Sequence, residues 1–277
     1  MSISGKSEST YRNYAQHLAK LVLHFECLPT ELDEDQISDY LYHVQQQHNT
    51  PSESYFKHSV YSLRFLFRLE GLNDKRIALP SIKKEHKLPI VLSREEMKRL
   101  LIAPKLLKHR ILLGILYGCG LRCMEVRSIR LAHIDYDRKT LLVPMTKGHR
   151  DRYVPLSDIL IRGIKKYIES EVPTDYLFGM PRENRAGGEF DSRYSQRGVQ
   201  WAVKEAAKAA GIKKAMSVHT LRHTYATHLL EDGLNILTIK NLLGHSSIET
   251  TMVYLHVANS ERINPFSPLD TLYPKQK

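Results

Sequence analysis

The sequence is poor in the residues that hold small secreted proteins together. Only three cysteines, Cys27, Cys119 and Cys123, occur in its 277 residues. Their odd number and the lack of paired CxxC spacing argue against a disulfide framework and against a structural zinc site.

Long apolar runs are missing too. No stretch approaches the roughly 18 apolar residues that span a bilayer. The opening MSISGKSEST has no apolar segment behind a basic cluster, so we expect no secretory signal. The sequence therefore predicts a cytoplasmic protein without a membrane partner.

Nucleotide and metal motifs are also absent. The chain has no GxxxxGK[ST] loop and no HExxH pair, the patterns that bind nucleotide phosphates and catalytic zinc. His219, His223 and His228 are close in sequence, but no cysteine or carboxylate cluster joins them. We therefore expect packing and capping roles for His223 and His228.

Positive charge is abundant and unevenly spread. The chain has 41 Lys and Arg against 30 Asp and Glu, a net charge of +11. Residues 1–92 hold 11 of each sign, whereas residues 93–277 hold 30 basic and 19 acidic side chains. Such a surface suits a polyanion such as nucleic acid. On charge alone, a basic solubilising surface is an equal alternative.

The first part of the chain has helical spacing. Apolar residues recur at steps of three and four over 10–27, over 36–47 and from Pro51 to Gly71, which predicts three helices. The lysine-rich segment 80–92 has no apolar period and is bounded by prolines, as in a linker. The length favours two domains, the first a helical domain over 1–79.

The second part, 93–258, mixes helices with a small β-structure. Ser93 and Glu96 predict a capping box. Two β-rich runs around a glycine-containing loop, 140–145 and 152–156, predict a hairpin. The remaining helices are expected over 106–119, 157–170, 193–210, 219–231, 236–243 and 247–257, with Trp201 in the core and an extended tail over 259–277. The fold class is mainly α with a small sheet.

Taken one at a time, the residues of this part are weak evidence for a functional site. A three-residue step puts His219 and Arg222 on one helix face, a plausible phosphate site, but His149 and Arg152 repeat the pattern by chance. Gly244 predicts a helix end before His245, and Ser246 with Glu249 predicts a capping box. A capped helix start, a capping histidine and a half-buried core tyrosine at position 254 are the plain alternatives.

The order of the motifs changes this interpretation. The segments YGCGLRCMEV from Tyr117, TKG from Thr146, HTLRHTYATHLL from His219, LLGH ending at His245 and TTMVYLH around Tyr254 together resemble the tyrosine recombinase (phage integrase) family. The resemblance covers nearly all of 93–257, and 1–79 is similar to the family's core-binding domain. Motif by motif, the family's catalytic residues correspond to Arg122, Lys147, His219, Arg222, His245 and Tyr254.

The resemblance implies a mechanism. Tyr254 attacks a phosphodiester, the two arginines hold the non-bridging oxygens, and His245 adds a donor. Lys147 protonates the departing 5′ oxygen and His219 accepts the tyrosine proton. Glu125 orients the site. No cofactor, neither ATP nor a metal, is implied, because the phosphotyrosyl bond stores the energy of the broken linkage.

The resemblance also implies partners. We expect double-stranded DNA, a homotetramer on synapsed DNA and a monomer or weak dimer when free, with an accessory directionality protein left open. The length is similar to the simple two-domain Xer-like or mobile-element integrases. A type IB topoisomerase and a DNA-binding regulator that does not cut remain alternatives.

Overall fold

The computed structural model describes residues 7–47, 53–72, 74, 77, 88–144, 151–179 and 191–258. The chain divides into two compact units, 1–86 and 87–277. Within the predicted linker 80–92, residues 80–87 lie outside the described residues, whereas Leu92 is buried in the core of the second unit. The predicted tail 259–277 also lies outside them.

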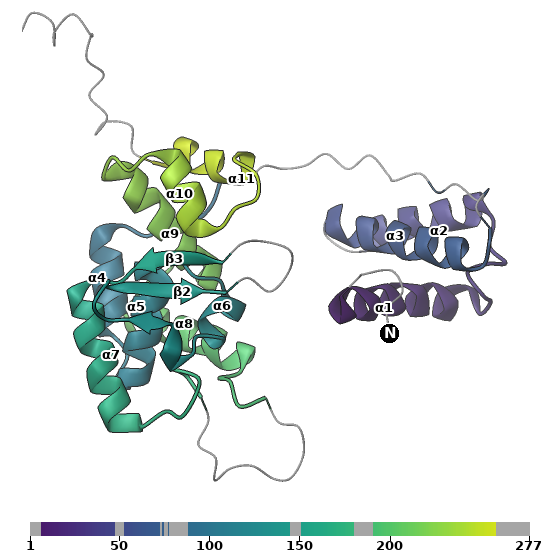
Figure 1. Ribbon diagram of the computed structural model, residues 1–277. Coiled ribbons are helices and arrows are strands. Elements are labelled where there is room, and N and C mark those ends of the chain that lie inside the picture. Colours follow the sequence, from purple (N-terminus) through teal and green to yellow (C-terminus); the bar gives the residue numbers. More distant parts are fainter. Residues whose placement is uncertain are drawn as a thin grey trace, which may run out of the picture. The chain divides into compact units, whose positions relative to one another are not determined.

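The first unit is helical, as predicted (Figure 1). Its helices are α1 (Glu8–Phe25), α2 (Glu34–Gln47) and α3 (Glu53–Leu69). The side chain of Ser7 caps α1 by accepting a hydrogen bond from the Thr10 amide, which satisfies a free donor of the first turn. Helices α1 and α3 pack together, and the apolar faces of all three helices enclose the core of this unit.

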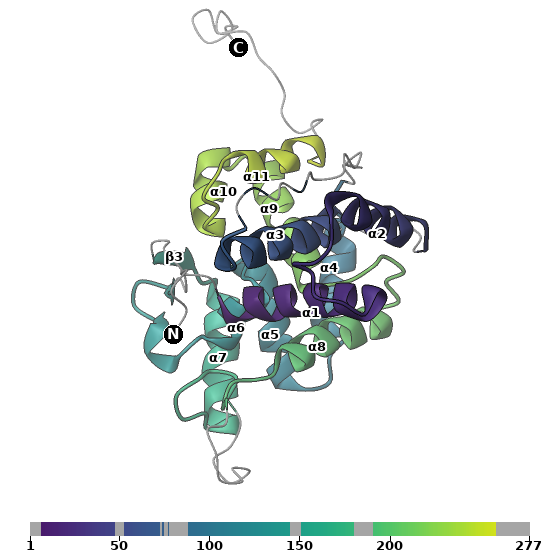
Figure 2. The same ribbon diagram turned by 90° about the vertical axis from the view of Figure 1, so that its right-hand side faces the viewer.

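The second unit contains most of the helices. They are α4 (Arg94–Ile102), α5 (Leu107–Gly118), α6 (Cys123–Arg127), α7 (Asp158–Glu171), α8 (Gln196–Ala209), α9 (Val218–Glu231), α10 (Ile236–Leu243) and α11 (Glu249–Met252). Short 3-10 helices cover Leu131–His133 and Val253–His256. Helix α5 packs against α7 and α9. The turned view of Figure 2 shows α10 and α11 together at one end of this unit.

A small antiparallel sheet completes the second unit. Its strands β1 (Ile134–Asp135), β2 (Thr140–Val143) and β3 (Arg152–Pro155) lie in sequence order. The predicted hairpin is β2 and β3, while β1 was not predicted. Val143 pairs with Arg152 and Leu141 with Val154, and all four are buried. The mainly α fold with a small sheet is confirmed.

Two local predictions were wrong. Trp201 is 55% exposed on α8 rather than in the core, because Val199, Ala202 and Val203 already fill the inward face of that helix. Ser246 does not cap α11. The Glu249 amide donates to Ser247 Oγ instead, and the predicted helix 247–257 is split into α11 and a 3-10 turn.

Within the described ranges, no helix has the length and apolar character that crossing a membrane requires.

Candidate active site

Helix α9 carries His219, Arg222 and His223 through the middle of the second unit. Ser217 and Thr220 form the capping box that starts the helix. Arg222 is only 3% exposed. Its Nη1 donates to the Gly120 carbonyl at 2.7 Å and its Nη2 to the Leu243 carbonyl at 2.6 Å. A buried guanidinium is thereby fixed by two backbone acceptors, as buried charges require.

Arg122 reaches the same place from the start of α6. It is the N-terminal cap residue, and its amide donates to Glu125 Oε2 at 2.8 Å. Its Nη1 donates to Glu125 Oε1 at 3.0 Å and to the Leu243 carbonyl at 3.5 Å. Gly120 makes the preceding turn with φ +62, and a Cβ there would lie 2.3 Å from Tyr225. Only glycine fits this turn.

Glu125 joins Arg122 to a third arginine on strand β3. Arg152 Nη1 and Nη2 donate to the two carboxylate oxygens at 3.0 and 2.9 Å, and Arg152 Nε donates to the Leu242 carbonyl at 2.8 Å. Burial alone would raise the pKa of Glu125, but the hydrogen bonds and charge of Arg152, with the Arg122 amide and Arg222, lower it to about 2. Glu125 is therefore ionised at neutral pH.

The end of α10 faces these arginines. Its last carbonyls, those of Leu242 and Leu243, accept from Arg152, Arg122 and Arg222, at the helix end whose dipole favours cations. Gly244 ends the helix in the left-handed region with φ +64, as predicted. Because Gly244 has no side chain, Arg152 can pass within 3.1 Å of where a Cβ would be.

His245 follows that turn and is half-buried. Its Nδ1 and the Thr251 hydroxyl lie 2.9 Å apart, which orients the ring. Burial and the nearby charges of Arg222, Arg122 and Arg152 lower the pKa of His245 to about 4, so the imidazole is neutral at neutral pH.

Tyr254 lies in the 3-10 helix after α11 and is 1% exposed. It packs in a small core with Tyr225, Ile239 and Leu243. Burial raises the pKa of its phenol, and the charges of Arg222 and Arg122 act in the opposite direction. This buried tyrosine is thus core-packed and also lies in the field of two arginines.

The two histidines of α9 differ in exposure. His219 is exposed at the first turn, and partial burial of its ring with Arg222 and Arg122 lowers its pKa. His223 is half-buried, and in addition to the packing predicted for it, its Nδ1 lies 3.0 Å from the Tyr254 hydroxyl. His228 does pack: it is buried, and its two ring nitrogens contact the Tyr117 hydroxyl and the Leu92 carbonyl.

The cationic site, defined as Arg122, Arg152 and Arg222 with Glu125, therefore carries three guanidinium groups and one carboxylate. Its excess positive charge and its donors suit an oxyanion such as a phosphodiester. Among the residues that the structure describes, no three His, Cys, Asp or Glu side chains gather in a way that could hold a metal ion.

The structure thus draws five of the six predicted residues into one network: Arg122, His219, Arg222, His245 and Tyr254. Lys147 lies outside the described residues. Arg152 and His223 were missed. Strand alternation could have found Arg152, because an arginine two residues before the buried Val154 falls on the apolar face. Nothing in the sequence spacing indicated that His223 faces Tyr254.

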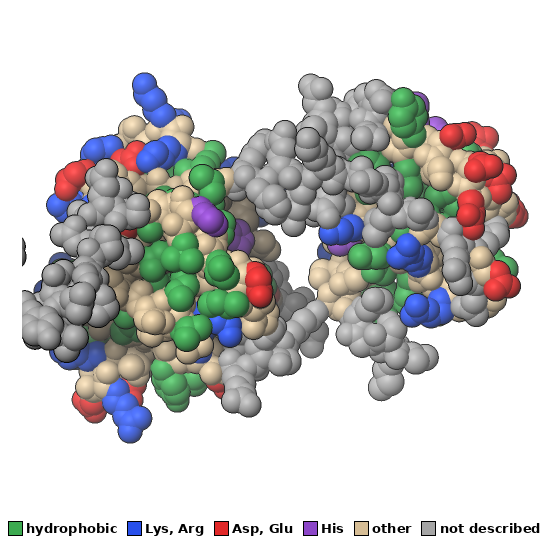
Figure 3. All heavy atoms as spheres, turned by 90° about the horizontal axis from the view of Figure 1, so that it is seen from above, with side chains coloured by type: hydrophobic (Ala, Val, Ile, Leu, Met, Phe, Trp, Pro, Cys, Tyr) green, Lys and Arg blue, Asp and Glu red, His purple; other side chains and the backbone are tan. Residues whose placement is uncertain are grey.

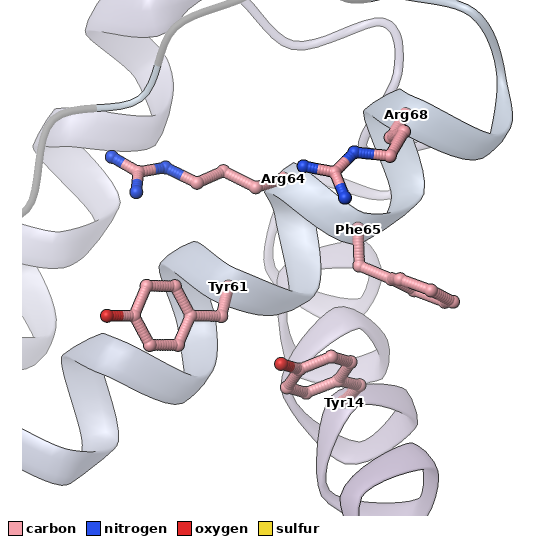
Figure 4. Close-up of a pocket in the computed structure, with 5 residues that line it drawn as sticks. All are labelled: Tyr14, Tyr61, Arg64, Phe65 and Arg68. Carbon is pink, nitrogen blue, oxygen red and sulfur yellow. The ribbon is translucent and has the colours of Figure 1, made fainter. Parts of the chain in front are cut away.

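The first unit has a basic surface of its own. A shallow pocket of ≈ 330 Å³ is lined by Tyr14, Tyr61, Arg64, Phe65 and Arg68. Figure 4 shows the two guanidinium groups along one side and the tyrosine rings along the other.

A group of acidic side chains of this unit lies elsewhere. Exposed acids follow the connection between α1 and α2: Glu26, Glu31, Asp33, Glu34 and Asp35. Figure 3 shows the acidic side chains of the first unit on one side and its Lys and Arg side chains on another. In the part of this unit that the structure describes, the exposed Arg64 and Arg68 thus form a local basic surface.

Comparison with known proteins covers both units. Residues 90–261 match the model of the phage integrase family, and residues 1–74 match the phage integrase N-terminal SAM-like domain. Tyrosine recombinase XerA of Thermococcus kodakarensis is 34% identical over 260 residues, 93% of this chain and 88% of that protein. A tyrosine recombinase of Thermosipho africanus is 31% identical over 276 residues, 95% of this chain and 94% of its own length.

Solved structures share the fold at low identity. The XerH site-specific recombinase bound to its difH substrate, in a pre-cleavage complex, aligns with a TM-score of 0.70 and 22% identity, over 88% of this chain and 76% of the other. The Tn1549 transposon integrase in complex with transposon right end DNA aligns with a TM-score of 0.68 and 14% identity, over 91% and 90%.

Proposed function

This chain belongs to the phage integrase family of tyrosine recombinases, and on that premise we propose that it is a site-specific DNA recombinase. It cuts and rejoins duplex DNA through a 3′-phosphotyrosyl intermediate and a Holliday junction. The catalytic residues of the proposal are Arg122, Lys147, His219, Arg222, His245 and Tyr254, with Tyr254 as the nucleophile. Arg152 and Glu125 hold the arginines in place.

The observation that carries the proposal is a buried tyrosine in the field of the buried Arg222 and the partly exposed Arg122. Tyr254 is 1% exposed and Arg222 is 3% exposed, and the charges of Arg222 and Arg122 favour the phenolate over the phenol. A free phenol with a pKa of about 10 costs roughly 4 kcal/mol to ionise at neutral pH. Cationic neighbours reduce that cost and also bind the phosphodiester that the phenolate attacks.

The chemical roles follow from the residue types. Arg122 and Arg222 bind the non-bridging oxygens and stabilise the charge that grows in the pentavalent transition state. His245, oriented by Thr251, donates to the same phosphate. Lys147 protonates the departing 5′ oxygen. The phosphotyrosyl bond keeps the energy of the broken linkage, so we expect cleavage without ATP and in EDTA.

Both units contribute to DNA binding in this proposal. The second unit supplies the net positive charge. The first supplies Arg68 with the exposed Tyr61 in the same pocket, a combination suited to phosphates and sugar edges. The guanidinium of Arg64 in this pocket also donates to the Ile77 carbonyl. Four protomers on two synapsed sites would exchange strands. An accessory protein that sets the direction of the reaction is a further candidate partner.

The experiment that tests the function uses a nicked suicide substrate, in which the short product diffuses away and traps the adduct. We expect wild-type protein to form a covalent protein–DNA adduct, and Tyr254→Phe to form none while binding DNA with unchanged affinity, since one hydroxyl is lost from a buried ring. Adduct formation by the Phe variant contradicts the assignment.

Two other results point to the alternatives. Supercoil relaxation without recombinant products indicates a type IB topoisomerase. DNA binding without an adduct from the wild-type protein indicates a regulator that does not cut.

A further inference from the structure

The hydroxyl of Tyr254 has a side-chain hydrogen-bond partner in the described structure, the ring of His223. Tyr254 Oη and His223 Nδ1 lie 3.0 Å apart, within hydrogen-bond distance. The two ring centroids are 5.7 Å apart, with an interplanar angle of 53°. His223 is on α9, one residue after Arg222, and the packing of α9 against the 3-10 helix of Tyr254 fixes both side chains.

Burial and the charged and titratable groups around His223 keep its ring neutral. It is half-buried, and this burial, with His219 and Arg222 on its own helix, lowers its pKa to about 4. His245, on the segment after α10, also faces it. A neutral imidazole with its proton on Nε2 presents a lone pair at Nδ1, so Nδ1 can accept the hydrogen bond that the Tyr254 hydroxyl donates.

His219 is placed differently. It is exposed, and its ring centroid lies 6.4 Å from that of His223. The residue that the sequence indicated as proton acceptor is thus one helical turn before the residue that touches the nucleophile. His219 stands beside Arg222 and Arg122, where a bound phosphate would lie.

We propose, resting on the proposed function, that Nδ1 of His223 accepts the proton of Tyr254 when the tyrosine attacks DNA. As the Oη–phosphorus bond forms, the O–H bond breaks and its electron pair stays on the oxygen. The proton moves to Nδ1 and makes His223 an imidazolium. The phosphorus–O5′ bond breaks, and the general acid of the site protonates O5′. In religation each transfer reverses, and His223 returns the proton to the leaving phenol.

Substrate binding activates this transfer. In the free protein, the positive charge of Arg222 disfavours a second cation on His223, and the phenol remains protonated. A phosphodiester bound by Arg122 and Arg222 brings a negative charge into the same site, which favours the imidazolium. The nucleophile is therefore ionised only when a phosphate is present to be attacked.

The test measures adduct formation on the suicide substrate by full-length His223→Ala and His223→Asn. Wild-type protein must first form the adduct, which separates failure of the proposed function from failure of this inference. His256→Ala is the control, because His256 is exposed two residues after the tyrosine. DNA affinity and thermal melting identify any variant that fails to fold, in which case the other variant carries the test.

We expect both His223 variants to cleave about 100-fold more slowly, the lower end of the range for general-base loss, with unchanged DNA affinity. Asparagine retains a hydrogen-bond acceptor near the place of Nδ1 but is not basic. A wild-type rate in either variant overturns the proposal, and recovery in the Asn variant alone means that His223 only positions the hydroxyl.

A second measurement separates proton acceptance from packing. We expect that a fluorinated, more acidic tyrosine at position 254 restores most of the rate in the His223→Ala background, because an acidified phenol needs less help from a base. A 5′-bridging sulfur, which leaves without protonation, should not restore it. Rescue by sulfur, or no rescue by the fluorinated tyrosine, overturns the proposal.

Discussion

The two units bury different kinds of side chain. In the described part of the first unit, the buried polar side chains are Ser59 and Ser62, whereas the second buries Arg127, Arg152 and Arg222. Buried charges cost desolvation free energy, and a hydrophobic replacement is often at least as stable. Two of the three, Arg152 and Arg222, belong to the cationic site, whereas Arg127 is paired with the Tyr194 carbonyl and Asp191. The arginines that the structure describes in the first unit, Arg12, Arg64 and Arg68, are on the surface, where they can meet a partner.

The largest effect on stability is expected from a substitution within the arginine cluster itself. Arg152→Met leaves Glu125, which is about 10% exposed in its side chain, without its bidentate partner. We expect a loss of about 3–5 kcal/mol in the free energy of unfolding. Urea denaturation followed by the fluorescence of Trp201, the single tryptophan of the chain and a reporter of the second unit, measures it.

The exposed Arg130→Met is the matched control and should cost less than about 0.5 kcal/mol. Adding Glu125→Gln to Arg152→Met should recover part of the loss, since it removes the buried carboxylate charge that has lost two of its donors. Equal stability of the Arg152 and Arg130 variants contradicts this account of the cluster.

A smaller effect is expected at the turn that carries Arg122. Gly120→Ala places a Cβ 2.3 Å from the Tyr225 ring at φ +62, and we expect a cost of about 2–4 kcal/mol from strain and overpacking. Gly211→Ala is the control, because Gly211 has a similar φ of +67 but open space around it. It should cost only the strain, about 1–2 kcal/mol. Denaturation curves that give the same cost for both variants refute the packing argument.

Acid should weaken the second unit progressively. The folded-state pKa values of His223 and His245 are lowered from 6.5 to about 4, so the unfolded chain takes up protons first as the pH falls. The stability that the neutral rings of His223 and His245 contribute is fully present above about pH 6.5. It is lost as the pH falls toward 4. Glu125, lowered from 4.5 to about 2, adds a further loss below pH 4.5.

The measurement is the urea midpoint of Trp201 fluorescence between pH 7 and pH 5, where we expect a decrease. Replacing both histidines with glutamine should flatten the dependence. A midpoint that rises on acidification contradicts the direction of these shifts.

The smallest effect is expected on the surface of the first unit. Arg68→Ala removes an exposed guanidinium from the pocket beside Tyr61. We expect unchanged stability, a several-fold loss of DNA affinity and a decrease of about 1 in the salt slope of binding. Glu34→Gln, at the acidic side of the unit, should not lower the affinity. A salt slope that Arg68→Ala leaves unchanged removes this face from the proposed DNA contact.

The helices were largely predictable because their signals are local. The spacing of apolar residues placed α10 at its observed bounds, Ile236–Leu243, and the other long helices within a few residues of theirs. Ser93 and Glu96 form the predicted capping box. Strand β1 was missed because two residues are too short for a period to show.

The site was predictable only as residue types in order. Glu125 and Arg152 are 27 positions apart, and Tyr254 lies 31 positions from His223. Contacts at such separations depend on how α6, β3, α9 and α10 pack, which spacing along the chain does not encode. The motifs therefore named Arg122, Arg222 and Glu125 but missed Arg152. They indicated His219 as the proton acceptor, where we propose His223, the hydrogen-bond neighbour of Tyr254.

Mass spectrometry of the proteolysed adduct from the suicide substrate, with end analysis of the released strand, identifies the nucleophile and the polarity of its bond to DNA. We expect a 3′-phosphate joined to the peptide that contains Tyr254 and a free 5′-hydroxyl on the other strand end. A nucleotide joined to any other residue, or through a 5′-phosphate, contradicts it.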